Sequence, residues 1–338
     1  GEGYTLHKGD MTFADRCGVC KDKAGMLVTM LRAAGFESYP AMTMAGSRID
    51  YVPADQFNHS VTVVKLSDGE WHLLDPTWVP FLRELWSSAE QQQNYLMGIP
   101  GGADLAITPI SPPENHYIKI KGKSTILEDG TLEGEITLEA EGQSDGSIRG
   151  LFTRSAKARW QQNLEGEIKR THPLAQIIKT EYADPYDYMA GPITIKIKYK
   201  IPDYAIMTDE NIIFVPFVAS KIFQRGMAHM YQNTGIKERT YGFRDRCSRM
   251  VALEEEITLP KSMKASIKYV PEADTLTTEI ASFTGKCELN EAGSVLKLDE
   301  KLTLSKRIYA AEDWPDYRQA VMAQKKFAEV AVILKLKY

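Results

Sequence analysis

The stretch Gly18-Val-Cys-Lys-Asp-Lys-Ala-Gly-Met-Leu-Val-Thr-Met-Leu-Arg-Ala-Ala-Gly35 predicts a helix over residues 21–34 with a cysteine at its start. The spacings of three and four that mark one helix face recur at Ala24, Leu27, Val28, Leu31 and Ala34. Gly35 follows directly, where a helix C-terminus favours a residue that tolerates positive φ. Cys20 therefore lies beside free helix N–H groups and the positive end of the helix dipole, which favour a thiolate.

Two short strands are predicted downstream of this helix. Residues 60–66 are β-branched and apolar, and residues 70–75 are mostly apolar. The Asp68-Gly69 pair between them favours a tight hairpin turn. His59 begins the first strand and Asp75 closes the second, so antiparallel pairing puts both side chains near the same end of one sheet.

Cys20, His59 and Asp75 are together the residue types that nucleophilic catalysis by a thiol needs. A histidine can hold a thiolate as its imidazolium partner and later protonate the leaving group. A carboxylate fixes the orientation and tautomer of that imidazole. We therefore predict a catalytic triad of Cys20, His59 and Asp75, which attacks the carbonyl carbon of an amide.

Each member also has a plainer interpretation. A cysteine is often a small buried apolar residue, and a histidine can be a hydrogen-bonded core residue. Asp75 precedes Pro76, and an Asp-Pro pair often starts a turn. The helix position of Cys20 and the occurrence of all three residues in order favour catalysis over these alternatives.

Cys17 and Cys20 form a C-x-x-C pair, which is typical of redox sites and of half a zinc site. The redox interpretation lacks a preceding strand and a βαβ context, and the zinc interpretation lacks two further ligands, since Cys247 and Cys287 are isolated. Both rank below catalysis. A disulfide between Cys17 and Cys20 would nevertheless inactivate the nucleophile, so Cys17 is a candidate redox latch.

Three motifs carry a resemblance to a known family. Gly18-Val-Cys-Lys-Asp-Lys-Ala24, Phe57-Asn-His-Ser-Val61 and Leu74-Asp-Pro-Thr77 resemble the transglutaminase-like core family. The resemblance implies an α+β papain-like fold, with Cys20 as nucleophile, His59 as base and acid, and Asp75 as orienting residue. The Cys20 backbone N–H is the natural oxyanion donor.

No motif supplies a side-chain oxyanion donor, and the indole N–H groups of Trp71 and Trp78 are the candidates for this role. More loosely, the whole chain resembles bacterial multidomain proteins in which such a core precedes β-rich domains of uncharacterised function. Those proteins are typically exported proteins of Bacteroidetes, which implies a periplasmic or cell-surface location. The chain itself begins Gly1-Glu-Gly3 and shows no targeting signal.

The 338 residues are enough for two or three domains. The junction Ile107-Thr-Pro-Ile-Ser-Pro-Pro-Glu114 resists both helix and sheet, so we place a domain boundary there. We expect a transglutaminase-like catalytic core over residues 1–110 and β-rich, sandwich-like material over 111–338. The family core usually has helices upstream of the nucleophile, so this core is expected to be minimal or to lack an N-terminal part. Further helices are expected over residues 87–95, on the surface, and over residues 147–167.

Charge and hydropathy exclude several classes of protein. The net charge of −4 and the pI near 6.0, without a basic cluster, argue against a nucleic-acid binder. The most apolar stretch, residues 212–223, is interrupted by Pro216 and Lys221 and is shorter than the ~20 residues of a membrane span.

The predicted reaction is thiol-dependent acyl transfer at an amide bond through a thioester. Hydrolysis is favoured, as in a cysteine peptidase or amidase, on a peptide or protein substrate that includes cell-wall peptides. The alternatives are a cross-linking transglutaminase and a catalytically silent scaffold with a ligand-binding β-rich region. The mechanism requires neither a metal nor an organic cofactor.

Overall fold

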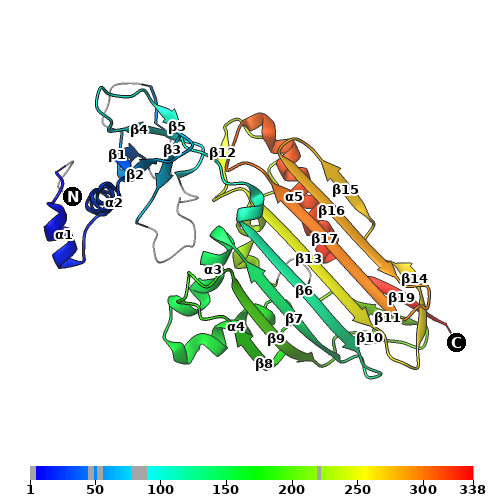
Figure 1. The fold of residues 1–338 in the computed structure, drawn as a ribbon. Coiled ribbons are helices and arrows are strands. Elements are labelled where there is room, and N and C mark those ends of the chain that lie inside the picture. The colour runs from blue at the N-terminus through cyan, green and yellow to red at the C-terminus, as the bar shows by residue number, and fades with distance from the viewer. Residues whose placement is uncertain (1–4, 45–48, 52–55, 78–89, 219–221, 338) are drawn as a thin grey trace. The chain divides into compact units, whose positions relative to one another are not determined.

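The computed structural model describes residues 5–44, 49–51, 56–77, 90–218 and 222–337. The chain divides into two compact units, Gly1–Ser111 and Pro112–Tyr338, here called the N-terminal and C-terminal units. Helices and strands occur in both units (Figure 1).

The N-terminal unit packs helix α2 against a five-stranded antiparallel sheet of order β3-β2-β1-β4-β5. Its elements are α1 (Gly9–Asp15), α2 (Cys20–Ala33), β1 (Glu37–Thr43), β2 (His59–Lys65), β3 (Trp71–Leu74), β4 (Asn94–Met97) and β5 (Ala106–Ile107). The predicted helix is confirmed, and Gly35 adopts φ +91° just after it. The Thr62 hydroxyl donates to the Ala24 carbonyl at 3.2 Å, which ties β2 to the helix.

The β2–β3 hairpin is confirmed and brings the two site strands together. Thr62 pairs with Leu74 and Lys65 with Trp71, and Gly69 takes φ +83° in the turn. A side chain at that position would be strained, so the glycine permits the tight connection. His59 begins β2 and Asp75 directly follows β3, so both lie at the open end of the hairpin.

The expected surface helix over residues 87–95 is wrong where the structure describes it. Residues 87–89 lie outside the described residues, and Asn94–Met97 forms strand β4. Glu90, Gln91 and Gln93 are buried rather than exposed. The Ser111 N–H donates to the Gln91 side chain at 2.9 Å, and the Gln93 N–H donates to the Thr108 hydroxyl at 2.9 Å. The side-chain amides of Gln91 and Gln93 fit inside the unit because they hydrogen-bond there, Gln91 to Ser111 and Gln93 to the Met44 carbonyl, which composition alone does not reveal.

The C-terminal unit is rich in strands, as expected, and also contains helices. Its helices are α3 (Gly142–Thr153), α4 (Trp160–Lys169) and α5 (Trp314–Glu329), with short 3-10 turns η2 (Pro113–Asn115), η3 (Lys157–Arg159), η4 (Gln224–Gly226), η5 (Ala228–Tyr231) and η6 (Ala311–Asp313). Its strands are β6 (Tyr117–Ile126), β7 (Leu132–Ala140), β8 (Gln176–Tyr182), β9 (Ile193–Ile201), β10 (Ile206–Met207), β11 (Asn211–Phe214), β12 (Phe243–Arg244), β13 (Arg249–Thr258), β14 (Lys264–Tyr269), β15 (Asp274–Thr277), β16 (Ala281–Leu289), β17 (Val295–Leu304), β18 (Ile308–Tyr309) and β19 (Val332–Lys337). The helix predicted over 147–167 is two helices, because a turn at residues 154–159 separates α3 from α4.

A single eight-stranded sheet, of order β15-β16-β17-β13-β6-β7-β9-β8, organises this unit (Figure 1). Strand β9 shows its construction, since buried isoleucines alternate with exposed Thr194, Lys196 and Lys198. The polar face carries cross-strand ion pairs, such as Lys196 with Glu135 and Lys200 with Glu133, both at 2.9 Å. The central β6–β13 pair is parallel and joins strands far apart in the chain.

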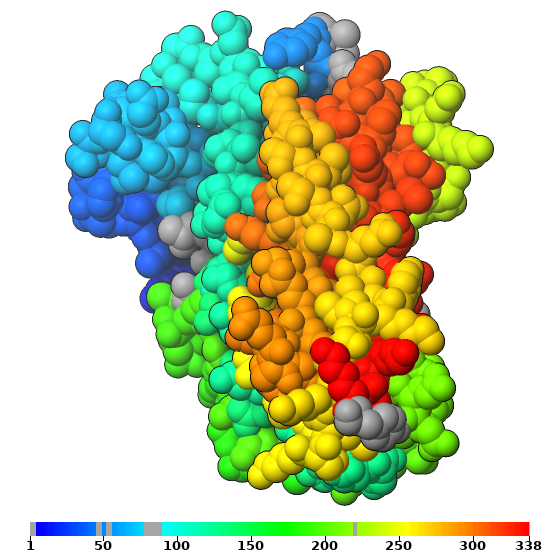
Figure 2. Space-filling model, turned by 90° about the vertical axis from the view of Figure 1, so that its right-hand side faces the viewer, coloured from blue at the N-terminus to red at the C-terminus, as the bar shows by residue number. Residues whose placement is uncertain are grey.

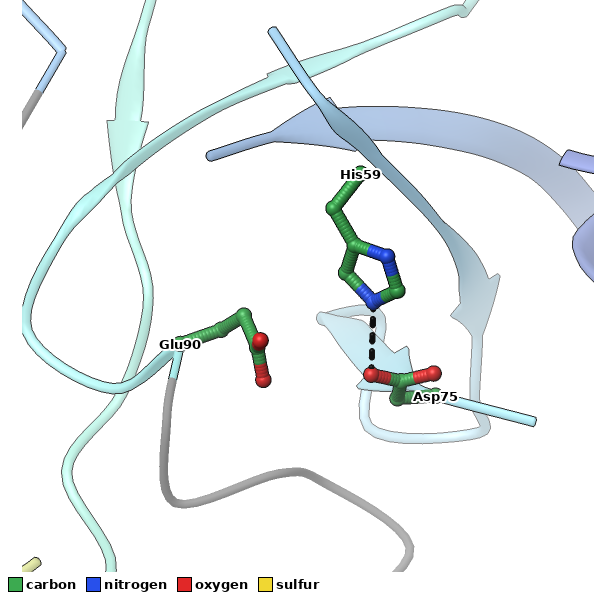
Figure 3. Close-up of side chains that lie close together, drawn as sticks. All are labelled: His59, Asp75 and Glu90. Atoms are coloured by element: carbon green, nitrogen blue, oxygen red, sulfur yellow. Dashed lines mark hydrogen bonds and ion pairs between the residues drawn. The ribbon is translucent and has the colours of Figure 1, made fainter. Parts of the chain in front are cut away.

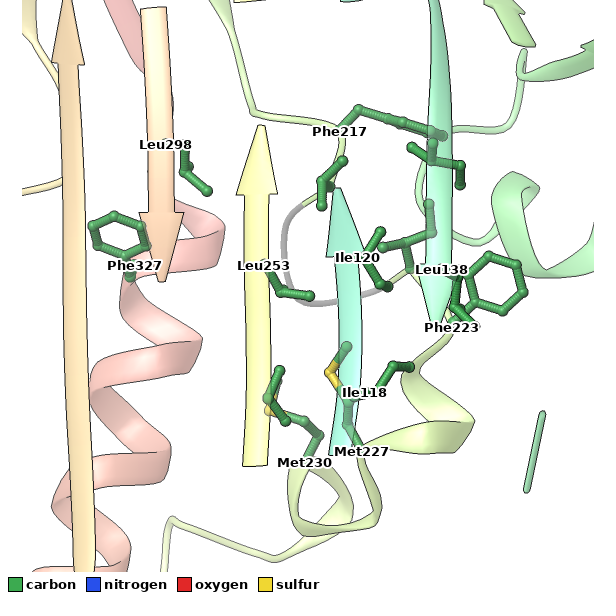
Figure 4. Packing of buried hydrophobic residues seen from close by; sticks show 14 of the residues in the cluster. Ile118, Ile120, Leu138, Phe217, Phe223, Met227, Met230, Leu253, Leu298 and Phe327 are labelled. Atoms are coloured by element: carbon green, nitrogen blue, oxygen red, sulfur yellow. The ribbon is translucent and has the colours of Figure 1, made fainter. Parts of the chain in front are cut away.

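The apolar face of this sheet is covered by a mixed layer, so the sandwich expectation holds only in part. A four-stranded sheet of order β10-β11-β19-β14 and helices α3 and α5 share one core with the large sheet. Helix α5 packs on β16 and β17, and the ring of Phe327 meets that of Phe283 edge to face with centroids 6.0 Å apart. Figure 4 shows Phe327, Leu298 and Ile120 among the buried side chains of this core. Figure 2 looks onto the edge of the unit where β15 lies, and there the red β19 lies next to the yellow β14.

Candidate active site

Cys20 is the first residue of α2, and its thiol is free and partly exposed. The carbonyl of the preceding Val19 accepts the N–H groups of Asp22 and Lys23, both at 3.1 Å. The Cys20 N–H belongs to the first turn, whose N–H groups have no acceptor one turn earlier. This backbone group and the helix dipole favour negative charge at the position of the sulfur and of a developing oxyanion.

Asp22 fixes the entry into this helix. Its buried carboxylate accepts the Val19 N–H at 3.1 Å, and the His7 N–H and Nδ1 at 3.1 and 3.0 Å. Burial alone would raise the pKa of Asp22, but these hydrogen bonds outweigh it and lower the pKa. Asp22 is therefore an ionised group that completes the helix start.

His59 and Asp75 form a buried pair (Figure 3). His59 Nε2 lies 2.9 Å from Asp75 Oδ2, and the two side chains are 10% and 0% exposed. Asp75 Oδ1 accepts the N–H of Thr77 at 2.9 Å and its hydroxyl at 2.6 Å. Asp75 thus makes the turn that the Asp-Pro pair predicts and also holds the imidazole, one oxygen for each task.

The imidazole of His59 also reaches the thiol. Burial by itself would lower the pKa of His59, but the hydrogen bond and negative charge of Asp75, a hydrogen bond with Cys20 and the charge of Glu90 together raise the pKa to about 9. His59 is therefore an imidazolium at neutral pH. Since Nε2 faces Asp75, Nδ1 is the nitrogen left for Cys20.

Glu90 is a member of the site that the sequence did not indicate. A side-chain oxygen of Glu90, one of Asp75 and a ring nitrogen of His59 all lie within 4.8 Å of one another. Figure 3 shows the Glu90 carboxylate turned toward the imidazole. The Thr108 hydroxyl donates to the Glu90 carbonyl at 2.5 Å and anchors this segment. The sequence does not single out Glu90, because it lies in a Gln-rich stretch that resembles a surface helix.

The same three side chains offer one nitrogen and two carboxylates, a donor set that suits a divalent metal. A metal on His59 Nε2 would displace the hydrogen bond to Asp75. Among the described residues, this cluster of potential ligands contains no cysteine. The zinc interpretation of Cys17 and Cys20 gains nothing from it.

Of the two tryptophans proposed as oxyanion donors, the structure describes only Trp71. Trp71 begins β3 and pairs with Lys65, at the end of the hairpin remote from His59. Its ring packs against Tyr39, with ring centroids 5.8 Å apart, and lies under the Lys65 ammonium. This placement argues against Trp71 as an oxyanion donor. Trp78 lies outside the described residues.

Cys17 and Cys20 line two different hollows. Cys17 lines one of about 260 Å³ together with Arg16 and Pro76. Cys20 lines a pocket of about 350 Å³ together with His59. Both thiols are free, so the latch between them stays a prediction.

The site defines an N-terminal unit of mixed helix and sheet in which a helix-start thiol, an imidazole and a carboxylate converge. Residues 3–76 match the family model of the transglutaminase-like superfamily, which confirms the resemblance carried by the three motifs. The matched segment contains Cys20, His59 and Asp75.

The fold of the whole chain is similar to that of a solved protein of Parabacteroides distasonis described as a "putative protease". The TM-score is 0.53 at 13% sequence identity, and the match covers 99% of this chain and 47% of that chain. The chain thus spans about half the length of that protein, and at this identity the likeness concerns the fold alone. A search of curated proteins found no match. In the described part of the chain, no helix is long and apolar enough to cross a membrane.

Proposed function

We propose that the N-terminal unit is a papain-like catalytic core that performs thiol-dependent hydrolysis of an amide bond, with Cys20, His59 and Asp75 as its triad. One observation carries the proposal. The imidazole of His59 is hydrogen-bonded to buried Asp75 on one side and to the thiol at the start of α2 on the other. The superfamily match over residues 3–76 supports the same chemistry.

In the proposed reaction, the Cys20 thiolate attacks the amide carbonyl carbon and forms a C–S bond. The C–N bond then breaks, and His59 gives its proton to the leaving amine. Water next attacks the thioester while the imidazole accepts its proton, and the C–S bond breaks to release a carboxylic acid. The thiolate–imidazolium pair is thereby restored. The Cys20 N–H supports the oxyanion in both steps.

Hydrolysis is preferred over amine transfer by analogy with bacterial families of this kind. The substrate is proposed to be a peptide or protein outside the cytoplasm, with cell-wall peptides included. Incorporation of a fluorescent amine into a glutamine-bearing protein would identify the cross-linking alternative instead.

The decisive experiment is the pH profile of iodoacetamide alkylation at Cys20, measured by peptide mass spectrometry. At neutral pH the wild type is expected to be alkylated faster than a free thiol, because the imidazolium of His59 stabilises the thiolate. The His59→Ala variant is expected to be alkylated only as fast as a free thiol.

The matched control is His72→Ala. His72 lies on β3 of the same sheet but is exposed and bonded to Asp68 at 2.8 Å, so its removal should leave the profile unchanged. A wild type that is alkylated no faster than His59→Ala at neutral pH would contradict the proposal.

A further inference from the structure

The pocket beside Cys20 and His59 has a mainly apolar lining. Its apolar side chains come from four separate segments of the N-terminal unit and are Leu6, Pro40, Met42, Phe57, Leu96 and Met97. Among the described residues that line it, none carries a carboxylate, while Lys21 and His59 contribute positive charge. The pocket therefore suits an apolar group and opposes a cationic one.

Strand pairing explains why these side chains gather at the nucleophile. Met42 of β1 pairs with Ser60 of β2 on one side and with Leu96 of β4 on the other. These positions share the sheet face that carries Thr62, which bonds to α2. The apolar side chains of β1 and β4 that line the pocket thus lie beside the first residues of α2, which include Cys20.

The volume of about 350 Å³ sits at the lower end of the ~300–1,000 Å³ range of ligand pockets. It holds one large side chain with adjoining backbone. Resting on the proposed thiol chemistry, we infer that this pocket binds a large apolar side chain of the acyl part of the substrate, such as leucine, methionine or phenylalanine. The substrate class is then a peptide with an apolar residue next to the amide that Cys20 attacks.

The test uses acetyl-aminoacyl chloromethyl ketones with leucyl, phenylalanyl, glutaminyl and lysyl side chains. Cys20 displaces chloride from each and forms a thioether, so the second-order labelling rate reports how well each side chain is bound near the thiol. In the full chain, the leucyl and phenylalanyl probes are expected to label Cys20 at least ~10-fold faster than the other two.

Two variants test the pocket itself. Met42→Glu and Leu96→Glu are expected to lose the leucyl preference and to gain reactivity with the lysyl probe. Iodoacetamide labelling of both variants separates this gain from misfolding, because a misfolded chain would lose the activated thiol and react with all four probes alike. The matched control is Met30→Glu on α2, whose side chain is exposed and lies outside the pocket lining, and it should keep the wild-type ranking.

Failures of the two proposals are distinguishable because iodoacetamide reports the thiol alone. Equal rates for all four probes, with an activated Cys20, would overturn the pocket inference and leave the proposed function standing. A wild-type ranking retained in both pocket variants would also overturn the inference. If Cys20 reacts with iodoacetamide no faster than a free thiol, the proposed function is overturned, and the inference that rests on it is overturned as well.

Discussion

At the scale of single residues, Asp75 and Glu90 give His59 two carboxylate neighbours of different kinds. Asp75 bonds directly to Nε2 and is itself held by Thr77, so it orients the ring. Glu90 acts on the imidazole through its charge at short range. Glu90 is therefore a positioning residue, which acts by raising the proton affinity of the His59 imidazole.

We expect Glu90→Gln to lower the pKa of His59, because it removes a negative charge that stabilises the imidazolium. The folded protein then loses this proton at a pH below the present value of about 9. Titration of the His59 ring protons by NMR checks this. A Cys20→Ala background in both proteins assigns the titration to His59 rather than to a coupled thiol–imidazole pair.

The control for this change is Glu70→Gln, an exposed carboxylate in the turn before β3. This substitution should leave the titration midpoint of the His59 ring unchanged. The role assigned to Glu90 is wrong if the midpoint is equal in Glu90→Gln and in the parent.

At the scale of elements, the start of α2 connects the N-terminal segment to the site. Asp22 holds both the Val19 N–H and His7, and the neighbouring Leu6 lines the pocket. The helix start therefore sets the nucleophile and one wall of the pocket together.

We expect Asp22→Ala to destabilise this region by about 1 kcal/mol, the usual effect of losing a helix-start carboxylate. Hydrogen exchange measured by mass spectrometry should become faster over residues 5–8 and 19–23. Asp10→Ala is the matched control, since Asp10 accepts a hydrogen bond at the exposed start of α1. Unchanged exchange in Asp22→Ala would show that other contacts hold the segment.

At the scale of the whole molecule, each unit has its own hydrophobic core. The C-terminal core extends over both sheets and the helices that accompany them. Among the described residues, the N-terminal core is small and centres on Ala41, Val61, Val63, Leu73 and Tyr95. Because the N-terminal core is smaller than the C-terminal core, we expect the N-terminal unit to be less stable than the C-terminal unit.

We expect the two units to unfold in separate transitions, the N-terminal unit first. Phe283 is fully buried and faces Phe327, so Phe283→Ala should destabilise the C-terminal unit by ~3–5 kcal/mol. Val63→Ala should lower only the first transition. Urea unfolding followed by pulsed hydrogen exchange of peptides from each unit measures both, and equal shifts of the two transitions would contradict the prediction.

Local patterns in the sequence are sufficient to predict several features of the N-terminal unit. The period of three and four residues defines α2, Asp68-Gly69 defines the hairpin, and together they place Cys20, His59 and Asp75 in one region. These signals lie within about 60 residues of chain and concern neighbours in a helix or a hairpin. They also carried the superfamily resemblance.

Other features of the site depend on contacts between segments that are distant in the chain, and local patterns do not predict them. Glu90 joins His59 because Thr108 and Ser111 anchor its segment, and the apolar pocket exists because β1 pairs with both β2 and β4. Trp71 turns out to lie at the far end of its strand, since register rather than residue type sets its position. No local pattern encodes such pairings, because their stability comes from side chains that meet only after folding.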